Sequence, residues 1–123
     1  MIYKYIEIAV PNSVVLVMDQ SAGEIPDSMN GCIVSASPTC VAIGTASEDD
    51  EQVLLELTDT PPKPDTDLRQ IHTSRISTPS REVAVCSIYD EKLLSIDVPS
   101  DVSQMEVWVN HPTEPNRIVV VAR

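Results

Sequence analysis

The residues in this sequence that most resemble a chemical site are four consecutive acids, Glu48, Asp49, Asp50 and Glu51, in the stretch TASEDDEQV. Such a run can hold a metal, form a solvated turn or attract a basic partner. Calcium loops alternate their carboxylates and fold them inward at a glycine, but these acids are adjacent and include no glycine. The run therefore favours a solvated turn or a partner-facing patch, and its four acids are candidate partner-binding residues. We expect no metal and no cofactor.

The histidines and cysteines could form a zinc site or a nucleophile–base pair. His72 and His111 lie in different segments, and neither has a cysteine or a second histidine at the spacing of zinc ligands. A Cys86–His72 pair would require adjacent strands to bring the two side chains together. Cys86 shares its strand face with Ala84 and Ile88, which favours a thiol in the core. The sequence also lacks the G-x-S-x-G, H-E-x-x-H and phosphate-loop motifs, so we predict that the chain is not an enzyme.

The single tryptophan, Trp108, is a further candidate for partner binding. In the segment MEVWVN, Met105, Val107 and Val109 alternate with Glu106 and Trp108. If the first three face the core, the tryptophan lies on the polar face with its ring partly exposed. An exposed tryptophan beside acids is a common anchor for a protein partner. The alternative is that the ring packs under the following loop, HPTEPNR.

The net charge of −11 is concentrated in one half of the chain. Residues 1–62 hold ten acids and a single base, Lys4, whereas residues 63–123 hold nine acids and seven bases. Phosphate binding needs clustered lysine and arginine, so the composition argues against nucleic acid and anionic membrane as partners. A partner recognised by charge should be a basic protein that docks on the first half.

Several features predict a cytoplasmic protein. The segment MIYKYIEIAV carries Lys4 and Glu7 inside its apolar stretch, unlike a secretory signal. No window approaches the roughly 18 apolar residues of a membrane span. An odd number of cysteines, Cys32, Cys40 and Cys86, indicates reduced thiols, and we expect all three to be small buried hydrophobic residues.

Short runs with period-two alternation recur along the chain and predict about ten strands. With three tyrosines, one tryptophan and no phenylalanine, the core must be built from aliphatic side chains, and β-branched Val and Ile favour pleated sheet. The predicted class is all-β, an antiparallel β-sandwich or partly open barrel of about eight to ten short strands. The best helical candidate, PDSMN, allows about one turn. The predicted strands lie in YKYIEIAV, SVVLVMD, GCIVSA, CVAIGT, EQVLLEL, QIHTSRIS, REVAVCSI, KLLSIDV, QMEVWVN and RIVVVAR.

Length predicts one domain, residues 1–123, with one irregular connection inside it. The segment TDTPPKPDTDLRQ, residues 58–70, contains three prolines and three aspartates. Neither a helix nor a central strand accommodates this composition. We therefore expect a long crossover from one sheet to the other.

The C-terminal third has a recognisable order of features. The segment Asp97–Pro99 ends one predicted strand, a turn leads to the strand with Trp108, and a loop precedes the apolar run Ile118–Val121. This order resembles that of the competence J nuclease inhibitors, which are small cytosolic bacterial β-sandwich proteins. The sequence departs from the family pattern at Ser100–Asp101, where a glycine–aromatic turn is usual, and no functional residue is carried over. The resemblance implies an acidic inhibitor or immunity protein that blocks a basic toxin or nuclease.

Two functions from different classes therefore follow. The first is a non-enzymatic acidic binding protein, in which charge steers a basic partner toward the first half of the chain. The alternative is a structural or assembly subunit that forms a homo-oligomer through a sheet face or an edge strand. The apolar run in RIVVVAR motivates this alternative, because such a run is unusual for an exposed edge.

Overall fold

The computed structural model describes residues 1–29, 31–47, 49, 51–63 and 67–123, and each of its ten strands overlaps one of the ten segments predicted from alternation. The fold is all-β, as predicted. Among the described residues the only helical element is a single 3-10 turn, η1 (Pro11–Ser13), and the helical candidate at residues 26–29 is not helical. The strands are β1 (Tyr3–Ile8), β2 (Val14–Met18), β3 (Val34–Ala36), β4 (Cys40–Gly44), β5 (Val53–Thr58), β6 (Arg69–Ser77), β7 (Glu82–Ser87), β8 (Lys92–Asp97), β9 (Val102–Val109) and β10 (Arg117–Ala122).

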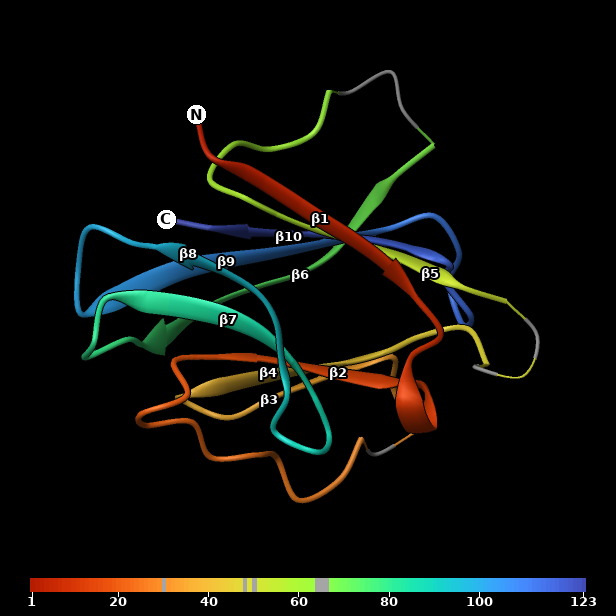
Figure 1. Cartoon of the computed structure of the whole chain (residues 1–123), viewed down its shortest axis with the longest axis horizontal. Coiled ribbons are helices and arrows are strands. Elements are labelled where there is room, and N and C mark those ends of the chain that lie inside the picture. The colour runs from red at the N-terminus through yellow and green to blue at the C-terminus, as the bar shows by residue number, and fades with distance from the viewer. Residues whose placement is uncertain (30, 48, 50, 64–66) are drawn as a thin grey trace.

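The strands form two five-stranded sheets that stack as the layers of a sandwich (Figure 1). Sheet A has the order β1-β5-β10-β9-β6, and sheet B has the order β3-β4-β2-β7-β8. All neighbouring strands are antiparallel except β5 and β10, which run parallel. The predicted hairpin around Pro38 is present, because β3 and β4 pair antiparallel on either side of it. The two sheets do not close into a barrel.

The main core lies between the sheets and consists almost entirely of aliphatic side chains. Each strand supplies alternate residues, such as Val15 and Val17 of β2 and Val107 and Val109 of β9, because successive side chains of a strand point to opposite faces. The alternation that predicted the strands therefore also identifies the face of each strand that enters the core.

Each outer face carries its own apolar cluster. On sheet B, Leu16, Met18, Cys40 and Cys86 belong to a cluster on which Met29 from the β2–β3 connection packs. On sheet A the corresponding cluster contains Leu68, Val119 and Val121, with Trp108 packed against it. The long connections thus contribute side chains to the packing of both outer faces.

Two expectations about strand connections are wrong. The connection that follows β5 leads to β6 in the same sheet, so the crossover between sheets expected at residues 58–70 is wrong; residues 64–66 of that segment lie outside the described residues. The apolar strand β10 is central, between β5 and β9, and its residues contribute to the main core on one face and to the outer cluster of sheet A on the other. Its burial on both faces accounts for the apolar run in RIVVVAR without self-association.

Candidate partner-binding site

The two described acids of the run, Asp49 and Glu51, lie in the connection between β4 of sheet B and β5 of sheet A. The β5 end of this connection is at the right-hand side of the view in Figure 1. Asp49 and Glu51 are both exposed. The backbone N–H of Asp49 donates to Ser47 Oγ over 3.3 Å, and the N–H of Glu51 donates to the Ser47 carbonyl over 3.2 Å. Glu48 and Asp50 lie outside the described residues. The two described acids therefore present their carboxylates on a turn, as predicted.

The loop between β9 and β10 holds this turn against the end of the sandwich. Asn116 Nδ2 donates to Glu51 Oε2 over 2.9 Å. The Asn116 carbonyl accepts from the Leu54 N–H over 2.8 Å, and the Pro115 carbonyl accepts from the Ala46 N–H over 2.9 Å. The turn is consequently anchored on both sides, which lowers the entropy cost of presenting its charges to a partner.

Trp108 lies on the outer face of sheet A. Its ring is half-buried and packs against the cluster that includes Leu68 and Val119, and its Nε1 donates to Glu106 Oε1 over 3.0 Å. The ring therefore packs over β10 and beside Leu68 of the β5–β6 connection. A role of Trp108 in partner binding stays a prediction.

Sequence reasoning missed two buried glutamates that share this outer face. Glu106 is 6% exposed and accepts hydrogen bonds from Gln70 Nε2 over 3.0 Å, from Trp108 and from Arg123 over 2.9 Å. Each donor comes from a different segment of the chain. The carboxylate therefore connects β6, β9 and the residue that follows β10.

The second buried glutamate, Glu56, is 5% exposed. It accepts from the Tyr3 hydroxyl and pairs with Arg117, whose Nε lies 2.8 Å from Glu56 Oε2. Burial of the Tyr3 hydroxyl, its hydrogen bond to Glu56 and the negative charge of Glu56 together raise the pKa of Tyr3 to about 12. The hydroxyl therefore remains a donor at neutral pH. The only signal of such sites in the sequence is an acid inside an apolar strand, as in LLEL and MEVW.

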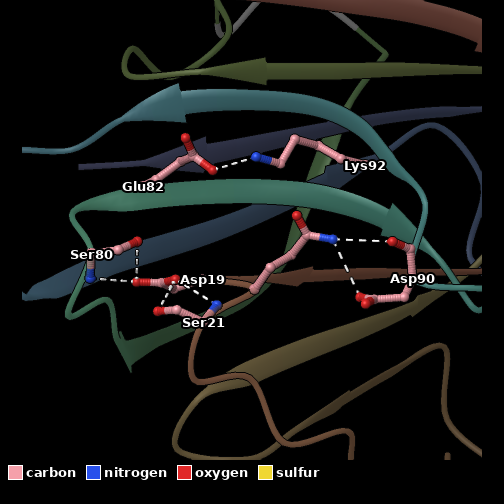
Figure 2. Close-up of polar contacts among 7 residues, drawn as sticks. Asp19, Ser21, Ser80, Glu82, Asp90 and Lys92 are labelled. Atoms are coloured by element: carbon pink, nitrogen blue, oxygen red, sulfur yellow. Dashed lines mark hydrogen bonds and ion pairs between the residues drawn. The ribbon is translucent and has the colours of Figure 1, made fainter.

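A third buried acid, Asp19, follows β2 and joins two distant segments. Figure 2 shows its carboxylate between Ser21 and Ser80, each of which donates to it through both backbone N–H and hydroxyl at 2.7–2.9 Å. Burial alone would raise the pKa of Asp19, but the hydrogen bonds from both serines outweigh it and lower the pKa to about 2. Asp19 is thus a charged residue that fixes the β6–β7 turn to the end of β2.

The same view contains two exposed contacts on sheet B. Lys92 of β8 forms an ion pair of 2.7 Å with Glu82 of β7. Asp90, in the turn between these strands, accepts from Gln20 Nε2 over 3.1–3.2 Å. These contacts link β7 to β8 and the turn between them to Gln20, and exposed pairs of this kind contribute little to stability.

The structure does not bring together the residues of the conceivable nucleophile–base pair. Cys86 is buried on the outer face of sheet B, whereas His72 lies on β6 of sheet A with Nε2 2.9 Å from Ser74 Oγ. Burial is the main cause that raises the pKa values of Cys40 and Cys86 to about 11, so both remain thiols at neutral pH. These two are core thiols, as predicted, but Cys32 is exposed, so the expectation that all three cysteines are buried is wrong.

The remaining histidine organises a loop. His111 Nδ1 accepts hydrogen bonds from the backbone N–H groups of Thr113 and Glu114 over 3.2 and 3.0 Å.

In the part of the chain that the structure describes, no three His, Cys, Asp or Glu residues cluster as metal ligands. The described residues also contain no helix long and apolar enough to cross a membrane.

Comparison with known proteins gives one informative result. No protein-family model matches the chain, and no curated protein sequence matches it. The fold is similar to that in the crystal structure of ComJ, inhibitor of the DNA degrading activity of NucA, from Bacillus subtilis, with a TM-score of 0.67 and 12% sequence identity. The similarity covers 97% of this chain and 93% of ComJ. It therefore extends over both sheets and is not confined to the C-terminal third, where the sequence resembles that family. At this identity it shows a shared fold.

Proposed function

We propose that this chain is a non-enzymatic inhibitor or immunity protein that binds a basic nuclease or toxin through its acidic turn, Glu48 to Glu51. The observation that carries the proposal is the exposed, anchored pair Asp49 and Glu51, on a fold similar to that of a nuclease inhibitor. A nuclease binds the phosphates of DNA with basic side chains, and exposed carboxylates present the same sign of charge to such a surface.

Charge should act mainly on the encounter with the partner. Exposed acids raise the association rate of oppositely charged proteins by about 10 to 1000 fold at low salt. The Glu51 carboxylate keeps its charge available because the donor that contacts it, the Asn116 side-chain amide, is neutral. Asp19 and Glu56, in contrast, are buried against their own donors. The turn is therefore the part of the acidic half best suited to a basic partner.

The experiment starts with capture of the partner from cells that express the chain, followed by its purification. The purified partner is assayed for degradation of plasmid DNA with and without the chain, and association rates are measured across salt concentrations. We expect inhibition, and an association rate that falls as salt rises. An acidic partner, undiminished DNA degradation or a salt-independent rate would contradict the proposal.

A matched pair of variants tests the turn itself. Glu48→Gln, Asp49→Asn, Asp50→Asn and Glu51→Gln together remove its charge and should slow association about tenfold or more at low salt. The control, Glu91→Gln, Asp97→Asn, Asp101→Asn and Glu114→Gln together, removes four exposed acids of the second half of the chain. It should change the rate much less, and equal slowing by both variants would mean that only overall charge matters.

A further inference from the structure

The strand β1 is the end strand of sheet A, and its hydrogen-bonding pattern shows which backbone groups face outward. Asp59 N–H donates to the Ile2 carbonyl, and the Ile2 N–H donates to Asp59 Oδ1, so Ile2 faces β5. Backbone groups of an antiparallel strand alternate between its two sides. The N–H and C=O groups of Tyr3, Tyr5 and Glu7 therefore point away from β5.

A hydrogen bond on the other side of β5 confirms which residues of β1 face outward. Leu54, which pairs in register with Glu7, donates its N–H to the Asn116 carbonyl next to β10. Leu54 thus faces β10, and its partner Glu7 faces away from β5. Within the described part of the chain, no strand occupies the outer side of β1.

Other end strands of the two sheets are interrupted or short. β6 has a register shift between Gln70 and His72, β8 pairs with a register shift at Val85, and β3 is three residues long. Irregular or short edges oppose pairing with another chain. β1 has six residues, no proline and continuous register with β5, so it is the regular end strand of the described fold.

The side chains along this edge provide a surface for contact. Tyr3 and Tyr5 are 48% and 65% exposed, and their ring centroids are 6.0 Å apart. The hydrogen bond from Tyr3 to Glu56 fixes the first ring. Exposed tyrosines supply large contact area at low entropy cost, and their faces attract arginine and lysine.

We propose that a strand of the basic partner adds to the outer edge of β1, with its backbone paired to Tyr3, Tyr5 and Glu7. On the outer face, where these three side chains lie, the added strand carries arginine or lysine, which pairs with Glu7 and stacks on Tyr5. This inference rests on the proposed function, because it identifies a second contact with the same partner.

Charge favours a basic strand over a second copy of the chain as the occupant. Each copy carries a net charge of −11, so two copies repel. In a two-fold antiparallel pair, opposite residues lie on the same face of the sheet. Lys4 and Glu7 lie on opposite faces of β1, because only positions that differ by an even number share a face of a strand, and these two differ by three. A copy therefore offers no Lys4–Glu7 ion pair across the edge.

The test uses a seven-residue peptide of alternating arginine and valine, acetylated and amidated, with the ¹⁵N-labelled full chain. Amide hydrogen exchange is measured residue by residue. At a concentration that fills about nine tenths of the sites, exchange of the Tyr3, Tyr5 and Glu7 amides should slow about tenfold, because only the free fraction exchanges. The amides of Lys4 and Ile6, which face β5, serve as the internal reference.

Two control peptides separate backbone pairing from charge. The same peptide with every backbone nitrogen methylated keeps its charge but has no backbone N–H donors, and glutamate in place of arginine reverses the charge. Neither should protect the three amides. Unchanged exchange with the arginine peptide, or equal protection by the methylated peptide, would overturn strand addition. Protection that appears without peptide as the protein concentration rises would overturn the basic occupant in favour of a second copy.

A pair of variants tests the same edge by mutation. Tyr5→Pro and Tyr5→Ala both remove the ring, but only the proline removes the outward N–H. Because that N–H does not bond to β5, both variants should have similar melting temperatures. Tyr5→Pro should bind the arginine peptide at least about tenfold more weakly than Tyr5→Ala, and equal affinities would overturn the proposal. If Tyr5→Pro does not fold, the exchange experiment on the unchanged sequence decides.

The outcomes distinguish this inference from the proposed function. If the chain inhibits its partner but the β1 amides are never protected, strand addition is wrong and the acidic turn is sufficient. If the β1 amides are protected by the arginine peptide but no basic partner is inhibited, strand addition stands and the proposed function is wrong.

Discussion

The acidic turn and the outer face of sheet A use the same carboxylate group in opposite surroundings. Asp49 and Glu51 are exposed on the turn. Glu56 and Glu106 are buried, and each accepts hydrogen bonds from an arginine and from other donors of the fold. A carboxylate surrounded by its own donors stabilises the chain to which it belongs, whereas an exposed one remains available to another molecule.

This difference changes how the net charge is interpreted. Of the ten acids in residues 1–62, Asp19 and Glu56 are buried and are bound by donors inside the fold. The charge that a partner meets is therefore smaller than the sequence total, and it is carried by residues such as Glu7, Asp49 and Glu51. Variants of the buried acids should change stability, and variants of the exposed acids should change binding.

The largest effect on stability is expected from Glu106→Ala. The change leaves Gln70, Trp108 and Arg123 without their shared acceptor, and a buried donor without an acceptor costs about 1 to 3 kcal/mol. Gln70 is exposed and the Arg123 side chain is 46% exposed, so water can hydrate both donors. We therefore expect a total loss of about 2 to 3 kcal/mol in the free energy of unfolding, measured in urea. The control, Glu114→Ala, removes an exposed acid, and a similar loss for both would contradict the comparison.

A smaller effect, which depends on pH, is expected from Asp19→Asn. Hydrogen bonds from Ser21 and Ser80 lower the pKa of Asp19 from 3.8 to about 2. A lowered pKa in the folded state stabilises the fold above the pKa of the unfolded chain, and this contribution disappears as the carboxylate is protonated between about pH 4 and pH 2. After allowance for solvent screening, the asparagine should cost about 1 to 2 kcal/mol at pH 7.

The pH dependence provides the control for this prediction. The free energies of unfolding of Asp19→Asn and the unchanged chain should converge as the pH falls from 4 to 2, because the protonated aspartic acid no longer has its charge. Asp101→Asn, which changes an exposed acid, should show no comparable convergence. A constant difference at all pH values would mean that the hydrogen bonds to Asp19 do not depend on its charge.

Trp108→Phe should have a still smaller effect on stability and tests the remaining candidate residue. Phenylalanine keeps an aromatic ring against Val119 but removes the donor to Glu106, which should cost about 1 kcal/mol. If Trp108 anchors the partner, the dissociation rate should also rise. A stability loss with an unchanged dissociation rate would show that the residue has only a structural role.

The strands of this fold were predictable from the sequence because alternation is a local signal, and each of the ten overlaps a predicted segment, although β9 begins two residues earlier than predicted. Strand order was not predictable, because neighbours such as β5 and β10 are far apart in the chain and pair parallel. This is why RIVVVAR was interpreted as an edge and residues 58–70 as a crossover between sheets. Both errors concern long-range pairing, which alternation does not encode.

In the candidate site, too, the local features were predictable from the sequence and the long-range contacts were not. Exposure of Asp49 and Glu51 on a turn followed from the consecutive acids between two apolar strands. The burial of Glu56 did not follow, because its partner Arg117 is 61 residues away and reaches it only through the pairing of β10 with β5. The alternation placed Glu106 and Trp108 together on one face, but the other two donors to Glu106 lie elsewhere in the chain, Gln70 on β6 and Arg123 after β10.

The smallest effect on stability, and the sharpest contrast with the buried acids, is expected when Glu48, Asp49, Asp50 and Glu51 are all replaced by asparagine or glutamine. Exposed charges contribute little to stability, and removal of four adjacent like charges relieves repulsion. The melting temperature should therefore stay the same or rise slightly. Loss of the hydrogen bond between Glu51 and Asn116 should be offset, because glutamine retains an acceptor at the same position.

Calcium provides the decisive control for the same four residues. If the turn held the ion, calcium would raise the melting temperature of the unchanged chain by mass action and would not affect the substituted chain. We expect no calcium effect on either protein, because adjacent carboxylates without an inward fold do not converge on one ion. Calcium-dependent stabilisation of the unchanged chain alone would make the turn a metal site. The slower association with the basic partner would then have to be measured again at saturating calcium, since bound calcium neutralises the charges that attract that partner.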